Sequence, residues 1–117
     1  DGADYPLRVF LMKDEVTVTI DTTGDSLHKR GYRTMAGAAP LSETLAASLI
    51  MLTPWHADRI LVDPFCGSGT FPIEAAMMAA NMAPGRNRSF TAEDWPHIVG
   101  KKVWYDASDE AEEMVER

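Results

Sequence analysis

The sequence has little cysteine, little positive charge and no long apolar run. A single cysteine in 117 residues cannot form a disulfide within the chain, which is typical of a reducing compartment. Eleven basic residues against 18 acidic ones give a net charge of −7, which excludes modules that capture nucleic acid by charge alone. No run approaches the roughly 18 apolar residues of a membrane-spanning helix, and no signal-peptide pattern opens the chain. We therefore expect a cytoplasmic protein with no membrane segment.

The remaining composition is that of one small globular domain. Hydrophobic residues make up 45% and charged residues 25%, near the average for globular proteins. A chain of this length can bury a modest core. The three histidines and Cys66 are scattered without the spacing of metal ligands, so we expect no metal site.

The first residues predict a β-hairpin. Two short apolar runs, 7–12 and 16–21, are separated by a polar break. In the second run Val16, Val18 and Ile20 alternate with polar residues, which indicates a strand with one buried face. Because a two-stranded hairpin is marginally stable alone, we expect it to pack against other protein.

Residues 22–37 are rich in glycine and charge, which predicts a loop, and Pro40 then predicts the start of a helix. Four leucines recur at helical spacing and predict that this helix buries an apolar stripe. They are Leu41, Leu45, Leu49 and Leu52.

Beyond the first helix, residues 60–62 (Ile-Leu-Val) predict a buried strand of a parallel sheet. Residues 71–82 predict a helix with Pro72 in its first turn, and two further helices are expected at about residues 94–98 and 103–116. The three tryptophans are expected to be packing anchors. The last helix is expected to turn Val103, Ala107, Ala111 and Met114 inward.

The segment 63–70, Asp-Pro-Phe-Cys-Gly-Ser-Gly-Thr, is the most informative about chemistry. A parallel strand ends at the sheet edge where α/β folds bind ligands. The two glycines let backbone approach a ligand closely, and the following helix offers free N–H groups with a partial positive charge. Asp63 can accept hydrogen bonds from ribose hydroxyls or an amino group. The segment therefore predicts a nucleoside-binding turn.

The residues discriminate between cofactors. A Walker-type phosphate loop needs a lysine after its last glycine, but Thr70 and Phe71 follow here. The dinucleotide fingerprint needs a third glycine where this chain has Pro72. S-adenosylmethionine has an amino-acid tail and no phosphate, which suits an acid beside a glycine turn. The pattern favours this cofactor, and a nicotinamide-dependent oxidoreductase is the less favoured alternative.

The same segment resembles the first cofactor motif of class I methyltransferases that act on exocyclic amines of nucleic-acid bases. Its flanks, residues 26–33 (Ser-Leu-His-Lys-Arg-Gly-Tyr-Arg) and 39–47 (Ala-Pro-Leu-Ser-Glu-Thr-Leu-Ala-Ala), sharpen the likeness. They are similar to THUMP-domain methyltransferases related to bacterial 23S rRNA guanine-N2 methyltransferase, a UPF0020-like group also described as N6-adenine-specific DNA methylases. The resemblance covers nearly the whole chain.

The resemblance implies an α/β fold, the start of a Rossmann-like class I methyltransferase domain preceded by a β-hairpin from a THUMP-type domain. Residues 1–26 would end the RNA-binding THUMP-like domain, 27–38 would be a linker, and 39–117 would be the incomplete N-terminal part of the methyltransferase domain. S-adenosyl-L-methionine is the implied cofactor. Its implied contacts are Asp63, Phe65, Gly67, Ser68, Gly69, Thr70, Pro40 and Leu41.

RNA is the expected partner, with large-subunit rRNA as the implied substrate. Basic residues next to Tyr32 suit a strand of RNA, and the candidates are His28, Lys29, Arg30 and Arg33. Cys66 lies inside the cofactor turn, where a small residue is enough, so it is not expected to be a nucleophile.

The sequence has no Asn/Asp-Pro-Pro-aromatic loop of the kind that holds a flipped base for amino methylation. We therefore expect no catalytic residue here and a fragment that is inactive alone, since methyl transfer requires an aligned acceptor. The predicted function is part of an S-adenosylmethionine-dependent RNA methyltransferase acting on guanine N2 of rRNA, with adenine N6 left open. The alternative is a non-catalytic RNA-binding or assembly module that keeps the turn as scaffold.

Overall fold

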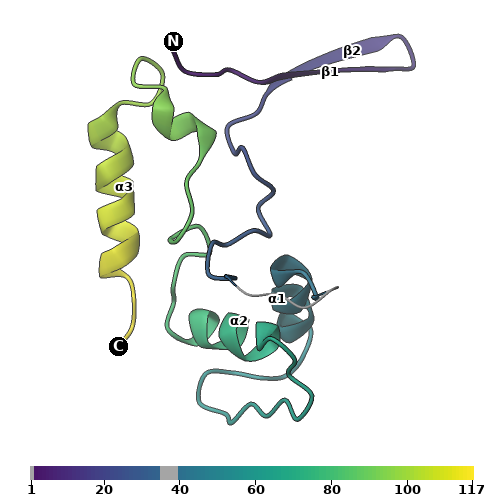
Figure 1. Ribbon diagram of the computed structural model, residues 1–117, viewed down its shortest axis with the longest axis vertical. Helices are drawn as coiled ribbons and strands as arrows, with labels where there is room; N and C mark the ends of the chain where they lie inside the picture. Colours follow the sequence, from purple (N-terminus) through teal and green to yellow (C-terminus); the bar gives the residue numbers. More distant parts are fainter. Residues whose placement is uncertain (1, 35–39) are drawn as a thin grey trace.

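The computed structural model describes residues 2–34 and 40–117. A hairpin of β1 (Leu7–Met12) and β2 (Glu15–Ile20) projects from one end of the molecule (Figure 1). Helices α1 (Glu43–Met51) and α2 (Thr70–Ala79) pack together at the other end. A short 3-10 helix, η1 (Thr91–Asp94), leads to α3 (Lys101–Glu113), which runs along one side.

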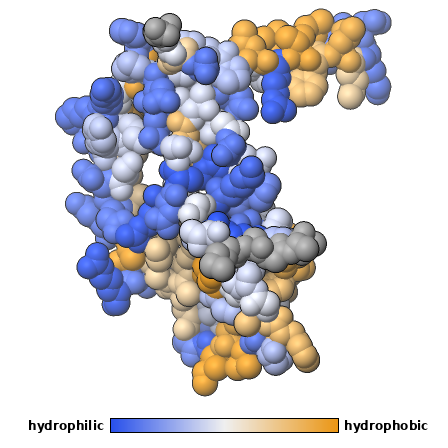
Figure 2. Space-filling model, viewed as in Figure 1, coloured by the Kyte–Doolittle hydropathy of each residue, from blue (hydrophilic) through white to orange (hydrophobic). Residues whose placement is uncertain are grey.

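The predicted hairpin is confirmed. Its strands pair antiparallel from Leu7 opposite Ile20 to Met12 opposite Glu15. Lys13 and Asp14 both have positive φ, which is the backbone of a two-residue turn that matches the strand twist. Paired residues share a face of a sheet, so the valines and leucines of the two strands form one apolar face. That face is exposed in this structure and forms an apolar arm (Figure 2).

Helix α1 packs against α2 through a different face from the one expected. Ala46 and Ile50 are buried, together with Ala75 and Met77 of α2. The predicted inward stripe is wrong for Leu45, Leu49 and Leu52, which are exposed. Leu45 and Leu49 each lie one residue before a buried position of α1. Because successive residues of a helix point in different directions, these two leucines face outward.

The strand predicted at residues 60–62 is not formed. These residues have no regular secondary structure, and Ile60 is 91% exposed. A strand requires a neighbouring backbone to satisfy its N–H and C=O groups. Within the described ranges the hairpin is the only sheet, so no partner lies beside residues 60–62. Apolar side chains gather on this loop, at the opposite end from the hairpin (Figure 2).

Trp95 is the packing anchor of the N-terminal segment. Its side chain is 1% exposed, its indole N–H donates to the carbonyl of Asp4 at 2.7 Å, and its ring stacks on Tyr5 at 5.2 Å between centroids. The helix expected at residues 94–98 is instead the shorter η1, which ends just before Trp95. Trp95, directly after η1, therefore holds Asp4 and Tyr5 in place, although it follows them by about ninety positions in the sequence.

The predicted helix α3 is confirmed, and Ala107 and Ala111 face residues 83–90 as expected, but the other two residues of the expected inward face do not. Val103 and Met114 are exposed. Trp104 is half-buried instead and its ring meets Phe90 at 5.7 Å. The aromatic pair therefore decides which side of this otherwise polar helix faces the rest of the protein.

The loop after the hairpin is held in place by Arg88. Its guanidinium donates to the carbonyls of four residues at 2.6–3.3 Å and lies over the ring of Phe90 at 4.6 Å. The four are Thr23, Asp25, Ser26 and Lys29. Gly31 has a φ of +87°, and a Cβ there would lie 2.0 Å from the carbonyl oxygen of Asn87. Residues 35–39 of the predicted linker lie outside the described residues.

Asp21 ends the hairpin with a local hydrogen-bonded turn. Its carboxylate accepts the amides of Thr23 and Gly24, and these hydrogen bonds lower the pKa of Asp21 below its ordinary value. The loop from the hairpin therefore starts in one defined direction. In residues 2–34 and 40–117, no helix is both long and apolar enough to cross a membrane.

We predict that Trp95→Ala destabilises the protein by about 3–5 kcal/mol, because it empties a closely packed site and leaves the Asp4 carbonyl without its donor. Urea unfolding followed by circular dichroism measures this loss. The control is Trp55→Ala, since Trp55 is only half-buried and lies in the exposed loop between α1 and α2. Equal losses for the two variants would contradict the assignment of Trp95 as the anchor.

Candidate functional site

The turn at residues 63–70 has the backbone that its sequence predicts. The amide of Gly69 donates to the carbonyl of Cys66 at 2.8 Å. Gly67 and Gly69 have φ of +56° and +84°, a region that costs other residues about 1–2 kcal/mol. Gly69 is also the N-cap of α2. The two glycines therefore bend the chain directly from the extended segment into the helix.

The outer side of this turn is open. Phe65 is 93% exposed, and a Cβ on Gly67 would meet nothing within 4 Å. Asp63 accepts a hydrogen bond from the amide of Phe65 at 3.1 Å. That bond uses one of the several acceptor positions of a carboxylate. A ligand could therefore reach the backbone at Gly67 and the carboxylate of Asp63 together.

The donor and acceptor groups of the turn fit S-adenosylmethionine. Its amino group and ribose hydroxyls need acceptors such as Asp63, its carboxylate needs N–H donors, and its adenine suits an exposed aromatic ring. The first turn of α2 offers backbone N–H groups, while Pro72 at its third position has none. No lysine follows Gly69 to hold a phosphate.

The second predicted cofactor segment lies at the start of α1. Pro40 is exposed and Leu41 is half-buried. Ser42 caps the helix by accepting the amide of Leu45 at 3.3 Å. Helix α1 therefore begins at Glu43, and Pro40 and Leu41 lie just before its capping residue.

Arg33 joins these two segments. Its Nη2 donates to the carbonyl oxygen of Leu41 at 3.0 Å and to the hydroxyl of Thr70. Its Nε lies 3.6 Å from a carboxylate oxygen of Glu43. The side chain of Arg33 is only 17% exposed. One guanidinium group therefore contacts both segments that the sequence assigned to the cofactor.

Arg30 and Tyr32 hold the same stretch of chain against the middle of α2. The Glu74 carboxylate, 3% exposed, accepts hydrogen bonds from Arg30 Nε at 3.0 Å and from the Tyr32 hydroxyl at 2.9 Å. Burial and the hydrogen bond to Glu74 raise the pKa of Tyr32. Tyr32 therefore remains a neutral donor to Glu74 at physiological pH.

The four residues predicted to contact RNA lie in two different environments. His28 is half-buried and Lys29 is exposed. The guanidinium groups of Arg30 and Arg33 instead face Glu74 and Glu43. Sequence reasoning missed these pairings. A charged residue at Glu74, inside an apolar helix, is the signal that could have found them, because buried carboxylates need a partner.

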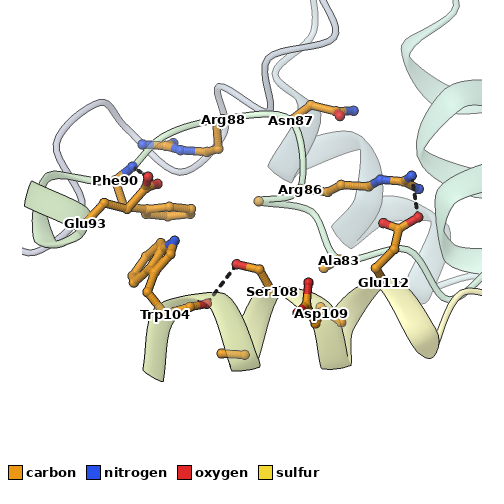
Figure 3. Close-up of a pocket in the computed structure, with 13 residues that line it drawn as sticks. Ala83, Arg86, Asn87, Arg88, Phe90, Glu93, Trp104, Ser108, Asp109 and Glu112 are labelled. Atoms are coloured by element: carbon orange, nitrogen blue, oxygen red, sulfur yellow. Dashed lines mark hydrogen bonds and ion pairs between the residues drawn. The ribbon is translucent and has the colours of Figure 1, made fainter. Parts of the chain in front are cut away.

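A separate cavity of about 540 Å³ lies between residues 83–90 and α3 (Figure 3). The rings of Phe90 and Trp104 face each other at one end, and Arg86 pairs with Glu112 at 2.7 Å at the other. None of the predicted cofactor residues lines it. Of its charged groups, Arg86 pairs with Glu112, Arg88 binds backbone carbonyls, and Glu93 accepts the amide of Phe90. The residues described contain no cluster of three metal-ligating side chains.

Comparison with known proteins gives one family match. The family model described as "UPF0020: RMKL-like, methyltransferase domain" matches residues 30–117. A Bacillus subtilis protein named "Putative RNA methyltransferase YpsC" is 54% identical over 96% of this chain. The "Ribosomal RNA large subunit methyltransferase K/L" of Shewanella pealeana is 48% identical over 94% of the chain. The chain spans 29% and 16% of the lengths of these two relatives.

Solved structures show the same fold. A "predicted N6-adenine-specific DNA methylase" from Listeria monocytogenes is 56% identical, with a TM-score of 0.92 over 98% of this chain and 30% of its own. SMU.472, described as "a putative methyltransferase complexed with SAH", is 47% identical, with a TM-score of 0.91 over 99% of this chain and 30% of its own. These structures confirm the predicted fold class, the start of an α/β methyltransferase domain after a hairpin.

We predict that Glu74→Ala destabilises the protein by about 3–5 kcal/mol, since it leaves the buried guanidinium of Arg30 without its counter-charge. The matched control is Glu112→Ala, which breaks the exposed pair with Arg86 and should cost at most about 1 kcal/mol. Thermal and urea unfolding of both variants provide the comparison. If Glu74→Ala lost no more unfolding free energy than Glu112→Ala, the stabilising role of the buried pair would be contradicted.

Proposed function

Because the chain belongs to the UPF0020 family of RMKL-like methyltransferase domains, we propose that it is the cofactor-holding part of an S-adenosylmethionine-dependent methyltransferase of large-subunit rRNA. The observation that carries this proposal is the open turn at residues 63–70. Its two left-handed glycines and the Asp63 carboxylate lie at the surface directly before α2. The same fold occurs in a protein described as complexed with SAH.

Each predicted cofactor residue has a role that its position supports. Asp63 would accept hydrogen bonds from the cofactor's hydroxyl or amino groups, and Phe65 would contact its apolar surface. Gly67, Ser68 and Gly69 would present backbone. Pro40 and Leu41 would form the opposite wall. When bound, S-adenosylmethionine supplies an electrophilic methyl group on its sulfonium.

Thr70 would act from inside the turn. It is only 5% exposed, and its hydroxyl is bound by Arg33. Its side chain would therefore shape the turn, while the cofactor would meet only the backbone at this position.

The proposed substrate is rRNA, with guanine N2 as the methylated atom. Relatives named large-subunit rRNA methyltransferase K/L support RNA as the substrate class. His28 and Lys29 could contact phosphates, but a chain with a net charge of −7 would bind RNA weakly by itself. Other parts of a longer protein would therefore supply most RNA affinity. A cytoplasmic location follows from such a substrate.

The apolar arm supports the proposed division of the chain. Residues 1–26 would complete a THUMP-type RNA-binding domain, residues 27–38 would link it, and residues 39–117 would begin the methyltransferase domain. The exposed valines and leucines of β1 and β2 would then be covered by the rest of the RNA-binding domain. Residues 60–62 would likewise gain strand neighbours from the rest of the methyltransferase domain.

We predict that Asp63→Asn in the full-length protein weakens binding of S-adenosylhomocysteine about 10- to 100-fold, because it removes a charge-assisted acceptor. Asparagine retains a side-chain oxygen for the Phe65 amide, so the turn should stay folded. Isothermal calorimetry measures the affinity, and Asp58→Asn in the exposed loop is the control. Unchanged affinity of Asp63→Asn for S-adenosylhomocysteine would refute this assignment. Binding of NADH by the wild-type protein, without binding of S-adenosylhomocysteine, would refute it as well.

We predict that the full-length protein transfers a labelled methyl group from S-adenosylmethionine to unmodified large-subunit rRNA. Digestion of the product to nucleosides, followed by chromatography, should place the label on N2-methylguanosine. The control substrate is duplex DNA, which should remain unlabelled. Label on N6-methyladenine would overturn the proposed atom, and absence of transfer to any RNA would support a non-catalytic module.

A further inference from the structure

The two proposed walls of the cofactor site belong to distant parts of the chain. Pro40 and Leu41 precede α1, and the turn at residues 63–70 leads into α2, which begins at Thr70. The apolar contact between the helices, through Ala46 and Ile50, lies further along α1 than Leu41 does. The packing of the two helices therefore does not itself fix the distance between the two walls, and another contact must set it.

Arg33 provides that contact. One of its terminal nitrogens donates both to the carbonyl of Leu41 at 3.0 Å and to the hydroxyl of Thr70. A guanidinium group is planar and its donors have fixed directions. Two acceptors bound by the same nitrogen are therefore held at a set distance from each other.

Buried charges keep this guanidinium in its place. Glu43, in the first turn of α1, is buried and lies 3.6 Å from Arg33 Nε. Arg30 and Tyr32 bind Glu74, four residues after Thr70 and hence on the same face of α2. The segment from Arg30 to Arg33 is therefore attached to α2 at two successive turns, and Arg33 is not free to turn toward solvent.

We propose that Arg33 is a positioning residue for the cofactor site, which sets the distance between the wall at Leu41 and the turn at Thr70. This inference rests on the proposed function and adds a determinant of cofactor affinity to it. Arg33 would act through Leu41 and Thr70, because its guanidinium faces these two residues and Glu43. The effect of its loss is thus expected on nucleoside binding and not on RNA binding.

The first test replaces Arg33 by lysine in the full-length protein. Lysine keeps the charge near Glu43 but has no planar fork to hold two acceptors. Calorimetry with S-adenosylhomocysteine should show about tenfold weaker binding, while filter binding of rRNA should be unchanged. The matched control is Arg88→Lys, which weakens the hydrogen bonds to four carbonyls in residues 23–29 and involves neither Leu41 nor Thr70. It should lower the melting temperature and leave the nucleoside affinity within about twofold of wild type.

A double-mutant cycle tests whether Arg33 acts through Thr70. Thr70→Val removes the hydroxyl and keeps the shape, so it should weaken nucleoside binding alone but add little in the Arg33→Lys background. Thr70→Ser restores the hydroxyl and should bind like wild type. The Thr70 variants also test the contact if Arg33→Lys does not fold.

Three outcomes would overturn the proposal. These are unchanged nucleoside affinity in Arg33→Lys or in Thr70→Val, fully additive effects in the cycle, or a loss confined to RNA binding. A wild-type protein that does not bind S-adenosylhomocysteine would overturn the proposed function and this inference with it. Binding by wild type with equal binding by the variants would overturn this inference alone.

Discussion

The arrangement around the turn depends on two buried carboxylates, on Glu43 and Glu74, that are neutralised by guanidinium groups from one short stretch of chain. Removing either partner of such a pair leaves a buried charge, which costs more than the pair itself stabilises. The pairs therefore act mainly by disfavouring any other packing of the chain in which one of these buried charges would lack its partner. Helices α1 and α2 share only a small apolar contact, so the buried charges decide where the two helix starts lie relative to each other.

The apolar surface is distributed unevenly over the molecule. A few side chains around Ile50 and Trp95 are buried, whereas the hairpin and the loop between α1 and α2 expose theirs (Figure 2). Contiguous exposed apolar patches are typical of surfaces that contact other protein. The chain spans less than a third of the length of these relatives. In the proposed division, the hairpin and the loop between α1 and α2 are the surfaces that other parts of a longer protein would cover.

Local features were predictable from the sequence, and relations between elements were not. The alternation in β2 and the paired glycines of the turn are set by neighbouring residues, so both were found. The outward leucines of α1 were missed because periodicity shows that a helix has an apolar face but not which helix covers it. The strand at residues 60–62 needs partners that the described residues do not supply. The contacts of Arg33 with Leu41 and Thr70 could not be read from the sequence, because Thr70 lies 37 positions away and no local pattern links it to Arg33.

The loop that leaves the hairpin has a further consequence. Arg88 donates hydrogen bonds to four carbonyl groups of this loop, and Gly31 packs so closely against Asn87 that a side chain would not fit there. The apolar arm thus keeps one direction relative to the turn at residues 63–70. Any protein surface that covers the arm would therefore be oriented relative to that turn by backbone contacts rather than by a flexible linker.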